Sequence, residues 1–297
     1  MNGSSRSIAI KKNIIASLFL KGISILVSLQ VVPLTINYIN PTRYGIWLTL
    51  SSIVAWLSYF DLGFAHGFRN RFAEAVAKGD MQLAREYVST TYVVLSLLFS
   101  SVFLIAIVVN HFVDWSAILN VDAAYSSELN IVFGILAFFF CLNIVASIFT
   151  TMLTANQKPA LASLIQTLGQ VFGFICIYIL TKTVPGNLDV LAFAFSGVPC
   201  FLLIIISIGM FLSGRYRHLS PSFHFVHFSL TKKIVGLGGQ FFIIMISMLF
   251  VFQLINIVIS RVAGPMAVTQ YNIAYKYFNV LVMSVNILFT PFWSAFT

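Results

Sequence analysis

Charged residues are scarce in this sequence, and their scarcity decides the class of protein. Only 8% of the 297 residues are charged and 59% are hydrophobic, whereas soluble domains carry about 25% charged residues. Cysteine is rare as well. Cys141, Cys176 and Cys200 are odd in number and lack CxxC spacing, so they predict neither a disulfide framework nor a metal site. The composition therefore predicts an integral membrane protein without a soluble domain.

Motifs for catalysis or cofactor binding are also missing. The sequence contains no HExxH, no phosphate-binding loop and no Gly-rich dinucleotide fingerprint. His218, His224 and His227 share one loop but have no acidic or thiol partners there, which argues against zinc. We therefore expect a protein that is not an enzyme and that uses no metal or other cofactor.

Eight apolar stretches are long enough to cross a bilayer, since a helix needs about 20 mostly apolar residues to do so. The third to seventh stretches contain no charged residue, and the other three carry one each: Lys21, Asp61 and Lys276. The predicted fold class is an all-α polytopic membrane bundle. The stretches are 14–39, 44–64, 87–110, 129–154, 160–181, 190–213, 234–260 and 267–297.

Basic residues fall mainly on one side of these spans. With the N-terminus in the cytoplasm, only Arg43, Lys182 and Arg261 lie in external loops. The cytoplasmic residues are Arg6, Lys11, Lys12, Arg69, Arg71, Lys78, Arg85, Lys158, Arg215, Arg217, Lys232 and Lys233. The positive-inside rule therefore predicts a cytoplasmic N-terminus. The net charge of +9 is divided among short loops, so we expect no nucleic-acid partner.

A weak internal repeat suggests how the spans are grouped. The turn Asn40-Pro41 before the second span matches Gly264-Pro265 before the eighth. Parallel repeats occur in transporters whose two bundles move about a central site. By this logic a second bundle needs about four more helices, and we expect the chain to be a fragment. The predicted organisation is a six-helix bundle over 1–220, a cytoplasmic linker over 221–233 and the first two helices of a second bundle over 234–297.

Several blocks resemble one known family. They are 59–64, 67–80, 238–243, 290–297 and, most specifically, Tyr271-Asn272-Ile273-Ala274-Tyr275-Lys276-Tyr277-Phe278. From about Lys12 to Thr297 the chain resembles bacterial oligosaccharide flippases on the O-antigen and capsule side of the multidrug, oligosaccharidyl-lipid and polysaccharide exporter superfamily. Such proteins have twelve to fourteen helices, of which this chain would supply about eight.

The resemblance implies a function at the bacterial inner membrane. It implies flipping of undecaprenyl-diphosphate-linked oligosaccharides from the cytoplasmic to the periplasmic leaflet for polysaccharide biosynthesis, including that of lipopolysaccharide. The implied partners are this lipid-linked glycan, membrane lipids and the polysaccharide polymerase machinery. The alternative is a cation-coupled multidrug exporter of the same superfamily. A third class, a membrane enzyme such as a polymerase, is disfavoured by the missing catalytic residues.

Polar residues within the spans are candidates for the substrate site, because an ionisable residue in a bilayer costs about 2.5–3.5 kcal/mol and faces a cavity or a partner. Lys276 shares one helix face with Asn272 and Asn279. That face predicts a solvated cavity, and the alternative is hydrogen bonding between helices. Lys21 begins the polar stripe Ser24, Ser28, Val31, Thr35 and Tyr38, and equally fits snorkelling to the headgroups.

The seventh span offers Gln253 and Asn256 on one face, and the external loops offer Arg43 and Arg261. In the fifth span we interpret Ser163, Gln166 and Gln170 as helix–helix contacts. The predicted substrate-binding set is Lys21, Arg43, Arg261, Lys276, Asn272, Asn279, Gln253 and Asn256. Every charge placed deep in the membrane is positive, which favours an anionic substrate over a cationic drug.

Asp61 lies at the cytoplasmic end of the second span, before Arg69 and Arg71. One interpretation is a gate closed by an ion pair between Asp61 and one of these arginines. The other, which we favour, is that Asp61 anchors the loop. The segment 67–79 that follows carries Phe68, Phe72 and Val76 on one face, which predicts a short helix lying in the membrane interface.

Overall fold

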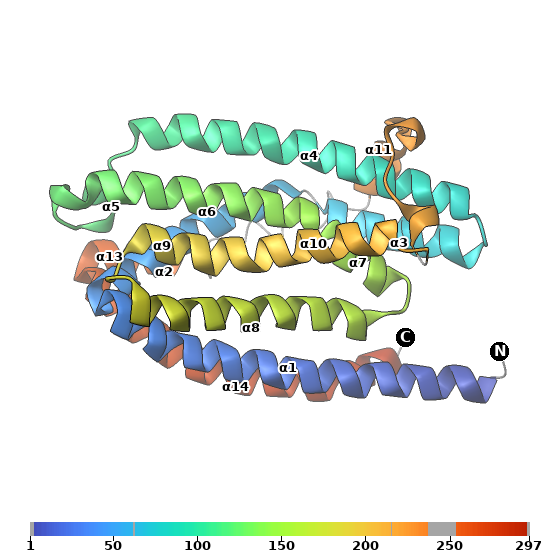
Figure 1. The fold of residues 1–297 in the computed structure, drawn as a ribbon, viewed down its shortest axis with the longest axis horizontal. Helices are drawn as coiled ribbons and strands as arrows, with labels where there is room; N and C mark the ends of the chain where they lie inside the picture. The colour runs from blue at the N-terminus through green and yellow to red at the C-terminus, as the bar shows by residue number, and fades with distance from the viewer. Residues whose placement is uncertain (1–2, 62, 215, 237–253, 296–297) are drawn as a thin grey trace.

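The computed structural model describes residues 3–61, 63–214, 216–236 and 254–295, and the regular structure in these ranges is helical, which confirms the all-α fold class (Figure 1). The long helices are α1 Gly3–Ile39, α2 Pro41–Ala55, α3 Phe64–Ala77, α4 Met81–Phe112, α6 Ser126–Ala146, α8 Pro159–Thr183, α10 Val198–Leu212 and α14 Pro265–Ala295. The short α-helices are α5 Trp115–Leu119, α7 Ile148–Ala155, α9 Leu188–Ala192, α11 Ser229–Val235 and α13 Leu254–Ala263. The 3-10 segments are η1 Trp56–Asp61, η2 Ala123–Tyr125, η4 Arg217–Leu219 and η5 Phe223–Phe225, and η3 Phe193–Gly197 is a π-helix.

Five helical segments in the described ranges are long and apolar enough to cross a membrane: 15–39, 81–112, 123–155, 159–183 and 188–212. A 25-residue helix is about 37 Å long, which exceeds a hydrocarbon core of about 30 Å. The predicted span 44–64 is not one α-helix, because α2 ends at Ala55 and the 3-10 segment η1 follows. Most of the predicted span 234–260 lies outside the described residues. The predicted eighth span is the 31-residue helix α14, which is not among the five.

The connecting segments gather at two ends of the molecule (Figure 1). One end, the α3 end, holds α3, α11 and the N-terminus, and the other, the α5 end, holds α5, α9 and α13. Acidic residues lie near both ends: Glu74, Asp80 and Glu86 at the α3 end, and Asp114, Asp122, Glu128 and Asp189 at the α5 end. The middle parts of the long helices, between these two ends, are apolar, as expected for segments in the hydrocarbon layer, which excludes charge.

Two clusters of buried side chains hold the long helices together. The cluster toward the α3 end includes Phe68, Phe72 and Phe149, and the cluster toward the α5 end includes Trp47 and Trp115. Phe68 and Phe72 of α3 are fully buried. The prediction that this helix uses them to lie in the membrane interface is therefore wrong, because their rings fill the space between α3, α4 and α7.

The segment after α10 is fixed to α4. The Arg85 guanidinium donates to the carbonyl of Ser220 at 2.9 Å and lies 4.2 Å from the centre of the Phe225 ring. The backbone N–H of Ser222 donates to the Ser89 hydroxyl at 3.1 Å, and that of His227 donates to Thr90 at 3.0 Å. A stretch that the sequence presents as a polar linker is thereby ordered along the first turns of α4.

A buried polar network joins α4, α5 and α6. The Asn110 side chain accepts a hydrogen bond from the Trp115 indole at 2.6 Å and donates to the Asn130 carbonyl at 3.1 Å. Asn110 and Trp115 are both buried. Because water cannot replace the bond to Trp115 in the interior, the indole N–H depends on Asn110, whereas the Asn130 carbonyl also has a donor within its own helix α6.

We expect Asn110→Leu to lower the unfolding temperature of the purified protein in detergent by several degrees. The substitution keeps the branched shape of the side chain but leaves the buried Trp115 indole N–H without its acceptor, at about 1–3 kcal/mol. Asn143→Leu, on an exposed position of α6, is the matched control and should change little. Equal unfolding temperatures for both variants would show that the network does not stabilise the fold.

Candidate functional site

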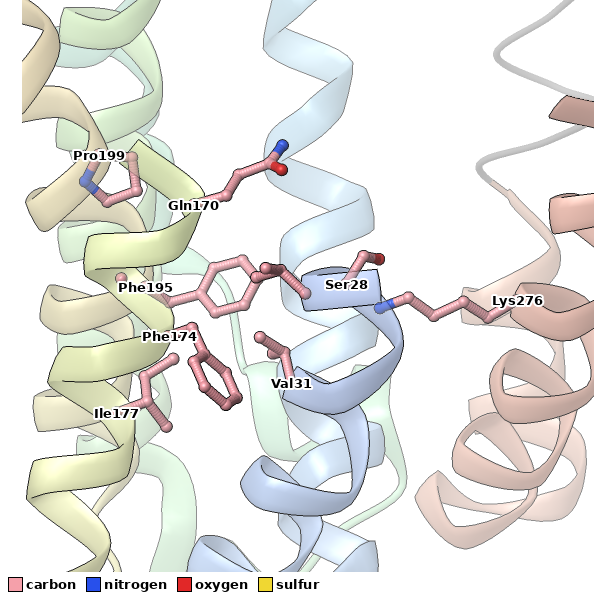
Figure 2. A pocket seen from close by; sticks show the side chains of 10 residues that line it. Ser28, Val31, Gln170, Phe174, Ile177, Phe195, Pro199 and Lys276 are labelled. Carbon is pink, nitrogen blue, oxygen red and sulfur yellow. The ribbon is translucent and has the colours of Figure 1, made fainter. Parts of the chain in front are cut away.

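A cavity of about 190 Å³ lies between α1, α8, the η3–α10 segment and α14 (Figure 2). Its walls are mainly apolar, and its polar side chains are Ser28, Gln170 and Lys276. None of the described residues around it is acidic. The lining consists of Val27, Ser28, Val31, Gln170, Gly173, Phe174, Ile177, Phe195, Pro199 and Lys276.

Lys276 is the one charged residue in the described lining of the cavity. Figure 2 shows its side chain extending from α14 toward Ser28 on α1. Nζ has no hydrogen bond or ion pair to another described residue, in contrast to Lys78 and Lys158, whose Nζ atoms bond to Glu74 and Tyr216. A half-buried ammonium group with no partner among the described side chains is suited to bind an anion.

The polar stripe predicted on α1 faces α8. Ser28 and Val31 line the cavity, while Ser24 bonds to Thr167 of α8 at 3.1 Å. Gln170 of α8, which the sequence led us to interpret as a helix–helix contact, lines the cavity instead. Lys21 is exposed one turn before Ser24 and does not line the cavity.

Two residues of the predicted substrate-binding set bond to each other. The Asn272 amide of α14 donates to the Asn256 side-chain carbonyl of α13 at 2.8 Å and to the Val268 carbonyl at 2.9 Å. These contacts match the helix–helix alternative for this pair. Asn279 is partly exposed on α14, and Gln253 lies outside the described residues.

Arg43 fastens the α5 end. One guanidinium nitrogen donates to the Gly186 carbonyl at 3.1 Å, the other lies 3.5 Å from the Glu128 carboxylate, and the group lies over the Tyr125 ring. Asn40 caps α2 by accepting from the Arg43 backbone N–H at 3.0 Å. In the structure Arg43 therefore connects α2 to α6 and to the loop before α9.

Arg261 and its neighbour Ser260 attach α13 to α5. The Ser260 hydroxyl donates to the Leu119 carbonyl at 2.9 Å, and the Arg261 guanidinium donates to the Ala117 carbonyl at 3.2 Å. The last carbonyls of a helix have no donors within the helix, so these bonds satisfy them. Asp114 caps the other end of α5, and the Ser116 hydroxyl that donates to it lowers the pKa of this carboxyl below its usual value.

The start of α14 packs directly on the start of α2. The Thr269 hydroxyl donates to the Pro41 carbonyl at 2.6 Å. A Cβ atom on Gly45 would overlap the Pro265 carbonyl, so only glycine allows the two helices to approach this closely. We call the contacts of Ser260, Arg261 and Thr269, with this Gly45–Pro265 approach, the α5-end latch.

Burial along α14 decreases away from the latch. Val268 and Thr269 are buried, whereas Tyr275, Tyr277 and Phe278 are exposed. The α13–α14 pair is thus attached to the other helices mainly near the α5 end.

The predicted gate at the α3 end has different partners in the structure. Arg71 forms an ion pair with Glu74 at 3.0 Å and donates to the Lys233 carbonyl at 3.3 Å. Arg69 is exposed, and the Asp61 side chain lies outside the described residues. Lys78 also pairs with Glu74, and the hydrogen bonds from Lys78 and Arg71 lower the pKa of this carboxyl.

Phe195, Gly45 and Thr269 have structural roles that sequence reasoning missed. Pro199, in a span that also contains Gly197, is the one signal that could have indicated an irregular turn beside Phe195, since proline removes a helical donor. Thr269 and Gly45 carry no comparable signal, because each acts through a helix distant in sequence.

The fold is that of a polytopic helical membrane protein, and two comparisons with known proteins give a match. Residues 10–294 match the model of the family described as polysaccharide biosynthesis protein, and the chain belongs to that family. No curated protein sequence gives a significant match.

A solved structure shares the fold. It is described as the inward-facing conformation of a multidrug resistance MATE family transporter of the MOP superfamily, with a TM-score of 0.59 and 13% sequence identity. The similarity covers 89% of this chain and 57% of that one, so the chain spans just over half of the transporter's length. At this identity the similarity shows the fold alone.

We expect Gly45→Ala to destabilise the protein by about 1–3 kcal/mol, because the added methyl group must push α14 away from α2. The matched control is Gly209→Ala, since a Cβ atom there meets no neighbour within 4 Å. Thermal unfolding in detergent measures the difference. If the two variants unfold at the same temperature, the close approach of α2 and α14 contributes nothing to stability.

Proposed function

We propose that the protein moves undecaprenyl-diphosphate-linked oligosaccharides from the cytoplasmic to the periplasmic leaflet of the bacterial inner membrane, for O-antigen or capsule assembly. The observation that carries this proposal is the Lys276 ammonium, which has no partner among the described residues, at a cavity without an acidic residue in its described lining. Such a group binds a diphosphate by charge-assisted hydrogen bonds. Membership of the polysaccharide biosynthesis family supports the substrate class.

The second candidate is a cation-coupled multidrug exporter, which the fold similarity to a MATE family transporter favours. Exporters of cationic compounds need a carboxylate within the membrane to bind the cation or proton. Among the described residues, Glu74, Asp80, Glu86, Asp114, Asp122, Glu128 and Asp189 lie near the two ends, and the one further acidic residue, Asp61, is the last residue of η1 and is not part of the described lining of the cavity. The anionic substrate therefore fits the charge distribution better.

In this proposal the α3 end faces the cytoplasm, because most lysine and arginine residues gather there. The α5-end latch then closes the periplasmic side, and a substrate enters from the cytoplasmic leaflet. Breaking the bonds of Ser260, Arg261 and Thr269 would accompany release on the other side. The decrease in burial along α14 away from the latch supports this direction.

Cysteine accessibility tests the orientation. In a variant with Cys141, Cys176 and Cys200 replaced by alanine, we expect Ala124→Cys at the α5 end to react with a membrane-impermeant thiol reagent applied outside the inner membrane. His224→Cys at the α3 end should react only after the membrane is permeabilised. Both positions are exposed. The reverse pattern would invert the orientation.

Substitution of Lys276 tests the function. In cells that depend on the complete product of this gene for surface polysaccharide, Lys276→Ala should reduce export about tenfold or more, because a hydrogen bond to a charged group is worth about 1.5–3 kcal/mol. Lys276→Arg should retain part of the export, and Lys276→Glu should be at least as inactive as Lys276→Ala, since it repels phosphate.

Membrane abundance of each variant, measured by immunoblot, is the control for folding. Normal polysaccharide export by an abundant Lys276→Ala protein would remove this residue from the site. Unchanged export together with a loss of resistance to cationic drugs would favour the multidrug exporter.

A further inference from the structure

The π-helix η3 interrupts the last membrane-spanning segment of the described first 212 residues at the cavity. It covers Phe193–Gly197 between α9 and α10. π-Helical turns are rare, occur mostly as single turns and are frequent at functional sites. Pro199 lies just beyond and lacks the backbone N–H that an α-helix would pair with the carbonyl of residue 195. The irregular turn therefore has a local cause in the sequence.

The two phenylalanines of this turn have different surroundings. Phe193 belongs to an aromatic cluster, with ring centres 5.2 Å from Phe139 and 6.2 Å from Phe201. Phe195 makes an edge-to-face contact with the buried Trp47 at 5.3 Å and lines the cavity. Figure 2 shows its ring between α8 and Val31 of α1. Trp47 supports the ring from one side, while 41% of the Phe195 residue surface stays exposed.

Close packing of glycine and proline fixes this wall. Pro199 lies against Gly169, where a Cβ atom would come within 3.2 Å of the proline, and against Gly173, where it would come within 3.6 Å. On the far side, a Cβ atom on Gly197 would lie 2.9 Å from the Phe139 ring. The turn that carries Phe195 is therefore held on both sides, and the ring has a fixed place in the cavity.

The lining combines a broad apolar wall with one cation. Val27, Val31, Phe174, Ile177, Phe195 and Pro199 are apolar, and Lys276 is positive. Ligand sites for whole small molecules measure about 300–1,000 Å³. A cavity of about 190 Å³ therefore takes only part of a ligand. A sugar ring would need more hydrogen-bonding partners than Ser28, Gln170 and Lys276 supply, because unpaired buried hydroxyl groups are costly.

We infer that Phe195 is a binding residue for the polyprenyl chain of the substrate, and that this cavity takes the isoprene units next to the diphosphate while Lys276 contacts the phosphate. The inference rests on the proposed function and adds which part of the substrate the first helices hold. Apolar isoprene units gain free energy on leaving water against such a wall. The oligosaccharide then lies outside the cavity, so its composition is not recognised there.

Substitutions on the π-helical turn test the contact. Phe195→Ala should reduce polysaccharide export about tenfold, because burial of an aromatic ring against the chain is lost. Phe195→Leu should keep most of the export, since an apolar surface remains. Phe193→Ala is the matched control from the same turn, facing Phe139 and Phe201, and should export normally. Normal export by an abundant Phe195→Ala protein would overturn the inference.

Photo-crosslinking identifies the part of the substrate that is bound. With p-benzoylphenylalanine in place of Phe195, irradiation of cells should attach the lipid-linked glycan to the protein. Mild acid hydrolyses the bond between the first sugar and the diphosphate, so an adduct on the prenyl chain loses its sugars under acid treatment. An adduct that keeps its sugars would show that the cavity binds the glycan. An adduct with phospholipid alone, or none, would also contradict the inference.

The two proposals fail in different ways. If Lys276→Ala abolishes export while the Phe195 variants export normally, the flippase function stands and the prenyl contact is wrong. If the Lys276 and Phe195 variants all export normally and no lipid-linked glycan is captured, the proposed function itself fails at this cavity.

Discussion

Hydrocarbon offers no hydrogen-bonding partner, and this constraint governs where every polar group of the chain lies. Some buried hydroxyl groups bond within their own helix, as Thr35 does with the Val31 carbonyl and Thr49 with the Gly45 carbonyl, and others bond to a neighbouring helix, as Ser260 and Thr269 do. Most charged groups of the described residues lie near the two ends, where several pair with helix-end carbonyls or with each other. Lys276 follows neither pattern. A group that departs from such a general rule at a cavity is best explained by a partner that arrives from elsewhere.

The helices themselves meet through small residues and proline. Because lipid is as apolar as a leucine side chain, association within a membrane depends on close packing and on hydrogen bonds between helices. Gly45 against Pro265 and Gly169 against Pro199 provide the first kind of contact, and the Asn272–Asn256 pair provides the second. Close packing of glycine against proline thus holds α14 on α2 and also forms the cavity wall around the π-helix.

Composition was sufficient to predict the helical membrane fold and the gathering of basic residues at one end, since both follow from the exclusion of charge by the bilayer. Helical spacing places Lys276 and Asn272 on one face of α14, but it could not decide between a cavity and a helix–helix contact: Lys276 lines the cavity, whereas Asn272 bonds to Asn256. The spacing of apolar residues did not predict the places where the backbone departs from the α-helix, namely η1 after Ala55 and the π-turn at Phe195. It also assigned Gln170 and the phenylalanines of α3 to the wrong surroundings, because which helices touch is decided by pairs far apart in sequence.

The attachment of the segment after α10 to α4 has a mechanical consequence. Three contacts hold residues 220–227 against Arg85, Ser89 and Thr90, so this stretch has little slack. Beyond His227, α11 is also fixed to the first helices, because Arg71 of α3 donates to the Lys233 carbonyl and Gly67 packs directly on Ile234. The chain from Ser220 to Ile234 therefore belongs mechanically to the first helices, and a rotation of α13 and α14 relative to them would leave this stretch in place.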